Sequence, residues 1–148
     1  MKRLENTDKV LPCADYDRMV RIWLDASVEA HDFISREFWV ENAEAMRTRY
    51  LPAAENYACL RDGEIVGFIS LIGNCIEALF VEPWIQGTGV GTALLNKAVS
   101  LRKELELSVY SDNKSALGFY IAQGFRVVEE RTDPVTGCRE KVMRKVVG

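Results

Sequence analysis

The hydrophobic and polar positions near the start of the chain repeat with the period of an amphipathic helix. Residues 14–30 place a mostly apolar stripe along one side of the expected helix, and the charged side chains fall largely outside it. The stripe comprises Tyr16, Met19, Val20, Trp23, Ser27 and Ala30. Asp15 is the expected N-cap. A second helix is expected to begin after its N-cap, Ser35, and to stop before Pro52, because a proline disfavours helical backbone in the residue before it.

The pattern then changes to short apolar runs that are typical of strands. Runs at 56–60 and 64–71 are joined by Arg-Asp-Gly, which indicates a hairpin. A third run, 75–81, ends just before Pro83. Further strands are expected at 105–109, 125–131 and 141–147, and a short one around residues 2–4 is a further candidate. Helices are expected over about 89–104 and 113–123, with Gly124 as the glycine that ends the second.

This order of elements predicts an α/β (α+β) fold. The hairpins imply antiparallel pairing, whereas the strand–helix–strand segment in the middle implies a parallel crossover. We therefore expect a mixed, mostly antiparallel twisted sheet of six or seven strands, flanked by four helices on both faces. Residues 1–148 are expected to form a single domain.

Composition narrows the classes of function. The hydrophobic fraction of 48% and the charged fraction of 28% are those of a soluble globular protein. A net charge of −3 and the lack of a basic stripe argue against a nucleic-acid partner. No apolar run approaches the roughly 18–20 residues that span a bilayer, and the N-terminus lacks a signal-peptide core. A cytoplasmic protein with no membrane partner is the expectation.

The cysteines do not indicate a metal site. Cys13, Cys59, Cys75 and Cys138 form no Cys-x-x-Cys pair, and His31 is the only histidine. Free thiols in or near the core are the simplest interpretation for a reducing compartment.

The stretch 86–91, Gln-Gly-Thr-Gly-Val-Gly, follows a strand and opens a helix. Unpaired backbone amides and partial positive charge at a helix N-terminus favour an anion, and glycines let a phosphate approach the backbone closely. No Lys-Ser or Lys-Thr follows as in a P-loop, and the spacing differs from the dinucleotide fingerprint. A tight turn without any ligand remains the alternative.

The same stretch resembles the signature of the GNAT superfamily of N-acetyltransferases. That signature is Arg or Gln, two residues, Gly, one residue, then Gly or Ala, and Gln86, Gly89 and Gly91 match it. A second motif of the superfamily, Asn-x-x-Ala-x-x-x-Tyr followed by Gly-Phe, is also present. It comprises Asn113, Ala116, Tyr120, Gly124 and Phe125. The order of elements agrees over nearly the whole chain, and residues 23–34 resemble a bacterial subgroup that includes protein-lysine and peptide acetyltransferases.

The resemblance implies acetyl-CoA as the co-substrate and no metal. Backbone amides of the glycine loop and the following helix would hold the pyrophosphate, namely those of Gln86, Gly87, Thr88, Gly89, Val90, Gly91 and Thr92. Main-chain groups of Leu79, Phe80 and Val81 would pair with the pantetheine arm in a gap between the strands at 75–81 and 105–109. Asn113 would contact the cofactor or order this region, and its alternative role is the N-cap of the following helix.

The resemblance also suggests the catalytic groups. Tyr120 is the candidate acid for the leaving thiolate, and core packing is its alternative role. Glu77 is the candidate base, because a carboxylate in an otherwise apolar strand would have a raised pKa if partly withdrawn from water. Its alternative is the solvent side of a half-buried sheet. A backbone N–H near Leu79 or Phe80 would stabilise the oxyanion.

The acceptor is not specified by the sequence. His31, Trp23 and Phe33 are candidates for the acceptor pocket, although a histidine at a helix end more often caps carbonyls and the aromatic residues more often belong to the core. A protein lysine, an N-terminal amine and a small amine all remain open, as does a monomer or a homodimer. The main alternative to an enzyme is a non-catalytic coenzyme A-binding sensor or interaction module.

Overall fold

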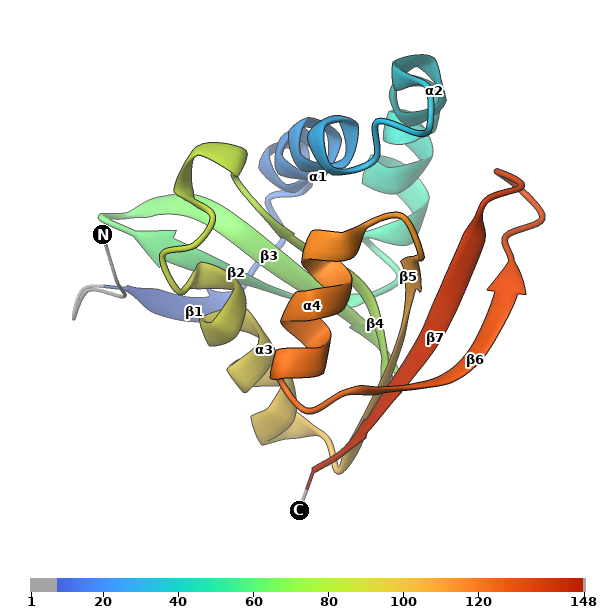
Figure 1. Ribbon diagram of the computed structural model, residues 1–148. Helices are drawn as coiled ribbons and strands as arrows, with labels where there is room; N and C mark the ends of the chain where they lie inside the picture. Colours follow the sequence, from blue (N-terminus) through green and yellow to red (C-terminus); the bar gives the residue numbers. More distant parts are fainter. Residues whose placement is uncertain (1–7, 148) are drawn as a thin grey trace.

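The computed structural model describes residues 8–147, and a seven-stranded sheet forms its framework (Figure 1). The strands lie in the order β1-β2-β3-β4-β5-β7-β6, and every neighbouring pair is antiparallel except β4 and β5. Their bounds are β1 Lys9–Pro12, β2 Glu55–Arg61, β3 Glu64–Ile72, β4 Cys75–Val81, β5 Glu104–Tyr110, β6 Arg126–Thr132 and β7 Arg139–Val146. The expected mixed, mostly antiparallel sheet is confirmed.

Four α-helices cover the two faces of this sheet (Figure 1). They are α1 Tyr16–Ala30, α2 Arg36–Ala45, α3 Val90–Leu101 and α4 Lys114–Ala122, with a π-helical turn at Met46–Tyr50 and a 3-10 turn at Pro83–Ile85. On one face Met19 and Trp39 of α1 and α2 pack against Phe68. On the other face Leu94 of α3 packs in a cluster with Ile69. Helices on both faces, as expected, therefore bury two separate apolar layers.

The predicted helix ends are largely confirmed. The Asp15 carboxylate accepts a hydrogen bond from the backbone N–H of Arg18 at 3.2 Å, and the Ser35 hydroxyl accepts one from Phe38 at 3.4 Å. Gly124 follows α4 with a φ of 93°, the left-handed conformation that favours glycine.

Two boundaries differ from the prediction. Helix α3 ends at Leu101 instead of near residue 104, because Arg102 takes an extended backbone with φ −134° and ψ 149°. Its side chain donates to the Gly73 carbonyl at 2.8 Å and pairs with Glu55 at 2.9 Å, so tertiary contacts end this helix. Strand β1 was not expected; it is four residues long and mostly exposed, so it carries little apolar pattern. The candidate strand at residues 2–4 lies outside the described residues.

Gly67 on β3 lets the first turn of α3 approach the sheet. A Cβ atom there would lie 2.9 Å from Val90 Cγ1 and 3.0 Å from the Phe80 carbonyl oxygen. We expect Gly67→Ala to lower the free energy of unfolding by about 1–3 kcal/mol through overpacking. Gly118→Ala is the matched control, because its Cβ would meet nothing within 4 Å inside α4, and it should stabilise by about 1 kcal/mol. Denaturant unfolding measures both, and two variants of equal stability would contradict the close approach.

Candidate functional site

Strands β4 and β5 pair at one position and then part. Their parallel register consists of Cys75 opposite Glu106, reinforced by a hydrogen bond from the Glu106 N–H to the Asn74 carbonyl at 2.9 Å. In contrast, β5 pairs with β7 from Glu104 to Tyr110. The edge of β4 that faces β5 therefore has no strand partner toward the carboxyl end of β4. This agrees with the expected gap between the two strands.

A cavity of about 730 Å³ lies at this gap, within the range of small-molecule sites. Four segments line it: the end of α1, the end of β4, the glycine loop with the start of α3, and the β5–α4 connection with α4. The lining residues are Ala26, Glu29, Ala30, His31, Leu79, Phe80, Val81, Gln86, Gly87, Gly89, Gly91, Thr92, Asp112, Asn113, Lys114, Ser115, Ala116, Phe119 and Tyr120. Most of the residues expected at the site therefore surround one cavity.

The glycine loop has the backbone of an anion site. Gly87 and Gly89 have φ values of 79° and 96°, and Gly89 is an N-cap of α3 without a side chain to satisfy the first amides. The Gln86 side chain donates to the Val81 carbonyl at 3.1 Å, which attaches the loop to the end of β4. These groups fit a phosphate, because unpaired amides and the positive end of the helix dipole meet at the cavity.

The end of β4 offers the second feature expected for an extended ligand. On its other edge Leu79 and Phe80 pair with Ile69 and Phe68 of β3. On the β5 side the same residues and Val81 line the cavity. A strand edge without a neighbour can accept hydrogen bonds from an added chain that carries amides.

Tyr120 projects from α4 into the same cavity. Its ring lies edge-on to Phe119 and Phe125, with centroids 5.3 and 5.5 Å away, and the residue is 8% exposed. Burial is the whole cause of a pKa for its phenol well above the ordinary value. Tyr120 thus belongs to the core and lines the cavity, and it stays protonated at neutral pH.

The α4 face that surrounds Tyr120 was only partly anticipated. Ser115, Ala116 and Phe119 line the cavity with it, at helical spacings that place them on one side of α4. The same spacing was available in the sequence. No sequence signal marked Ala26, Glu29 and Ala30 of α1, or Asp112 and Lys114 of the β5–α4 connection, which reach the cavity by tertiary folding.

His31 joins the end of α1 to the start of α4. Its Nε2 lies 3.1 Å from the Asn113 amide nitrogen, and the Asn113 oxygen accepts the Ala116 backbone N–H at 3.2 Å. Because that oxygen is engaged as the N-cap of α4, the amide nitrogen must donate and Nε2 must accept. The arrangement selects a neutral imidazole with its proton on Nδ1, a buried atom with no hydrogen-bond partner among residues 8–147.

Three aromatic rings surround the imidazole of His31. It stacks on Trp39 at 5.1 Å and lies edge-on to Tyr110 and Phe33 at 5.4 and 5.7 Å. Burial lowers the pKa of His31. His31 is therefore a buried neutral residue of the cavity wall, and both nitrogens are poorly placed to take a proton from an amine.

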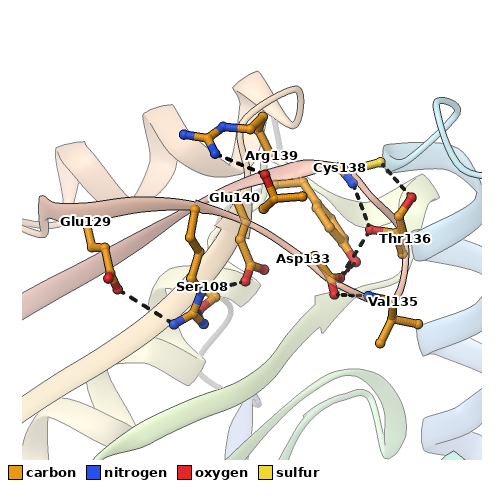
Figure 2. Close-up of polar contacts among 11 residues, drawn as sticks. Ser108, Glu129, Asp133, Val135, Thr136, Cys138, Arg139 and Glu140 are labelled. Atoms are coloured by element: carbon orange, nitrogen blue, oxygen red, sulfur yellow. Dashed lines mark hydrogen bonds and ion pairs between the residues drawn. The ribbon is translucent and has the colours of Figure 1, made fainter.

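Polar contacts among Asp133, Val135 and Thr136 hold the turn between β6 and β7 (Figure 2). The Tyr110 phenol donates to the Asp133 carboxylate at 2.7 Å, and the same carboxylate accepts the Val135 N–H at 2.9 Å and the Thr136 hydroxyl at 3.2 Å. Burial and this carboxylate raise the pKa of Tyr110. The hairpin is thus held against the end of β5, next to His31.

Three side chains expected at the site lie elsewhere. Trp23 is a core residue with its ring 5.6 Å from Trp39, and Phe33 packs against His31 without lining the cavity. Glu77 is exposed, which agrees with its alternative place on the solvent side of the sheet and contradicts partial withdrawal from water. It is the extra residue where Ser70 pairs with Ala78 and Leu71 with Ile76, a β-bulge that changes which side chains face each layer.

Two residues of the loop contribute no lining side chain. Val90, the first residue of α3, is 1% exposed and packs in the core. Thr88 turns its hydroxyl to the Ile85 carbonyl at 2.7 Å. Any role of these two residues toward a phosphate is therefore restricted to the backbone.

Comparison with known proteins agrees with this geometry. The family model described as "Acetyltransferase (GNAT) domain" matches residues 17–147. The chain belongs to the GNAT acetyltransferase family. The peptidyl-lysine N-acetyltransferase YiaC of Escherichia coli (strain K12) is 34% identical over 112 residues, covering 75% of this chain and 77% of that protein. YjaB of the same strain, a protein of the same description, is 36% identical over 112 residues, covering 75% and 76%.

Solved structures match most of the length of this chain. The apo form of YjaB from Escherichia coli matches with a TM-score of 0.84 and 28% identity, covering 96% of this chain and 99% of that one. PaiA N-acetyltransferase from Thermoplasma acidophilum, solved with coenzyme A, matches with a TM-score of 0.80 and 20% identity, covering 95% of this chain and 99% of that one. At this identity the match supports the fold alone. This GNAT chain is an acetyl-CoA-dependent N-acetyltransferase. None of its helices within residues 8–147 is long and apolar enough to cross a membrane.

The buried His31 makes the stability of this GNAT domain sensitive to acid. Its pKa is lower in the folded protein than the ordinary value near 6.5, so the unfolded chain binds more protons as the pH falls below that value. The contribution of the neutral imidazole to the free energy of unfolding is therefore fully present above about pH 6.5 and decreases as the pH falls below that value. We expect the stability advantage of the wild type over His31→Gln to shrink between pH 7.5 and 5, as measured by denaturant unfolding. A constant difference across this range would contradict a depressed pKa.

Proposed function

We propose that this enzyme transfers the acetyl group of acetyl-CoA to a lysine side chain of a peptide or protein, by direct attack in a ternary complex. The observation that carries the proposal is a single cavity where the glycine loop, the unpaired edge of β4 and Tyr120 meet. The names of the relatives YiaC and YjaB support a peptidyl-lysine acceptor.

The donor would occupy the cavity from the glycine loop to Tyr120. Backbone amides of residues 86–92 would bind the diphosphate, with Thr88 and Val90 contributing main chain only. Leu79, Phe80 and Val81 would pair with the amides of the pantetheine arm. Because the Asn113 side chain already caps α4 and donates to His31, its role would be to order this wall of the cavity.

Tyr120 would act as the general acid. The neutral amine attacks the thioester carbonyl carbon, the carbon–nitrogen bond forms, and the carbon–sulfur bond breaks. The leaving sulfur takes the phenol proton, and the proton released by the nitrogen returns to Tyr120 through water. A backbone N–H near Leu79 or Phe80 would stabilise the oxyanion without reorganisation. A phenol, with an ordinary pKa of about 10, is protonated at neutral pH and so has a proton to donate.

The charged side chains that line the cavity favour a cationic amine. Glu29 and Asp112 are exposed carboxylates that line it, and Lys114 is the single cationic side chain among the lining residues. Attraction to the two carboxylates would bring a lysine ammonium to the cavity, where it loses its proton to solvent before attack. Glu77 is exposed and outside the lining, so this mechanism does not use it as the base.

Removal of the Tyr120 hydroxyl should impair turnover selectively. We expect Tyr120→Phe to lower kcat by about 100-fold or more, since general acid catalysis contributes roughly 10²–10⁴-fold. The dissociation constant of coenzyme A should stay within about twofold, because the ring still fills its place beside Phe119 and Phe125. Glu77→Gln is the matched control and should retain wild-type kcat. Release of free thiol on a lysine-containing peptide is the readout, and an active Tyr120→Phe would remove Tyr120 from the mechanism.

The proposed lysine acceptor predicts that the carboxylates of Glu29 and Asp112 affect the KM of the peptide. With an N-terminally blocked peptide containing one lysine, Glu29→Gln and Asp112→Asn should each raise the peptide KM about two- to fivefold, as expected for exposed charge pairs. The KM for acetyl-CoA should not change. The same peptide with arginine in place of lysine should release no thiol. Coenzyme A binding without thiol release on any amine would instead support the non-catalytic sensor.

A further inference from the structure

A buried ion pair lies next to the glycine loop, outside the cavity lining. The guanidinium of Arg61, the last residue of β2, faces the carboxylate of Asp8, which precedes β1. Arg61 Nε lies 3.1 Å from both Asp8 oxygens and Nη2 lies 2.9 Å from Oδ2. The two side chains are only 4% and 5% exposed. The pair is therefore shielded from solvent, and the charge of Arg61 is balanced within the protein.

The same guanidinium also reaches the middle of the loop. Arg61 Nη1 donates to the Thr88 hydroxyl at 3.0 Å, and Nη2 approaches the Thr88 carbonyl at 3.5 Å. The Thr88 hydroxyl in turn donates to the Ile85 carbonyl at 2.7 Å. Thr88 is thus fixed on both sides, to the end of β2 and to the 3-10 turn that precedes the loop.

Thr88 stands where the loop most needs such a connection. Its neighbours Gly87 and Gly89 both have positive φ, and glycine gives a free chain access to many other conformations. Gly89 supplies no capping side chain for α3. A residue held between the two glycines limits their conformations and so sets the direction of the loop amides.

We propose that Arg61, anchored by Asp8, is a positioning residue that holds Thr88 so that the loop amides are arranged for a diphosphate before the ligand binds. A buried ion pair contributes little net stability as a rule, because desolvation offsets the attraction, whereas it can specify one conformation. The forked guanidinium serves Asp8 and Thr88 at once, which a lysine ammonium cannot reproduce. The inference rests on the proposed function in that the loop binds the diphosphate of coenzyme A.

The test compares a ligand that carries the diphosphate with one that ends before it. Calorimetry gives the dissociation constants of acetyl-CoA and of S-acetylpantetheine, which lacks the diphosphate and the phosphoadenosine beyond it, for the wild type, Thr88→Val and Thr88→Ser. Valine keeps the branched shape without the hydroxyl, and serine restores the hydroxyl. We expect Thr88→Val to weaken acetyl-CoA binding at least tenfold, Thr88→Ser to stay within about threefold of wild type, and S-acetylpantetheine to bind all three equally. Arg61→Lys, which keeps the charge beside Asp8, should repeat the selective loss.

Each other outcome has a distinct meaning. An equal loss of affinity for both ligands would overturn the positioning role and indicate a general structural effect. The same holds if Thr88→Ser binds acetyl-CoA as weakly as Thr88→Val. Unchanged acetyl-CoA affinity in Thr88→Val would overturn it as well. If the wild type does not prefer acetyl-CoA over S-acetylpantetheine, the loop does not bind the diphosphate, and the proposed donor site fails with it. Melting temperatures confirm that each variant is folded.

Discussion

The parting of β4 and β5 is the constraint on which the rest of the structure depends. Parallel neighbours in a sheet normally share evenly spaced hydrogen bonds, and here the shared register is Cys75 opposite Glu106. Backbone groups that lose a neighbour must find another partner, in solvent or in a ligand. The gap thus creates both the space of the cavity and the unpaired strand edge that an amide-bearing donor can use. The other groups of the site can act on a ligand only if they face the cavity at this gap.

Two connections hold the walls of the gap in place. On one side Gln86 attaches the glycine loop to the end of β4, and Arg61 at the end of β2 donates a hydrogen bond to Thr88 of the loop. On the other side Asn113 caps α4 and donates to His31 at the end of α1. The cavity is consequently bounded by the amides of the glycine loop on one side and by His31 and Asn113 on the other.

The position of Glu77 shows that a β-bulge prevents the period of a strand from predicting which face each side chain occupies. In a regular strand, residues two apart share a face, yet Ile76 belongs to the layer of α3 and Ala78 to the layer of α1 and α2. The bulge at Glu77 accounts for this change and leaves its carboxylate exposed. The apolar pattern of 75–81 correctly predicted the strand, but the side on which each residue lies depends on pairing with β3. Proton transfer therefore has to be explained with the groups that do line the cavity.

The sequence by itself determined the features that depend on neighbouring residues: the caps at Asp15 and Ser35, the glycine loop ahead of α3, and the placement of Tyr120 on α4. These follow from hydrogen bonds and sterics within a few positions along the chain, so their residue types and spacing are sufficient. Only the tertiary structure decided the register of β4, the neutral His31 beside Asn113, and the Arg61 contact to Thr88. The last two join residues 82 and 27 positions apart. Such contacts form because the sheet and its helices bury apolar surface together, and no local pattern in the chain encodes which distant side chains then meet.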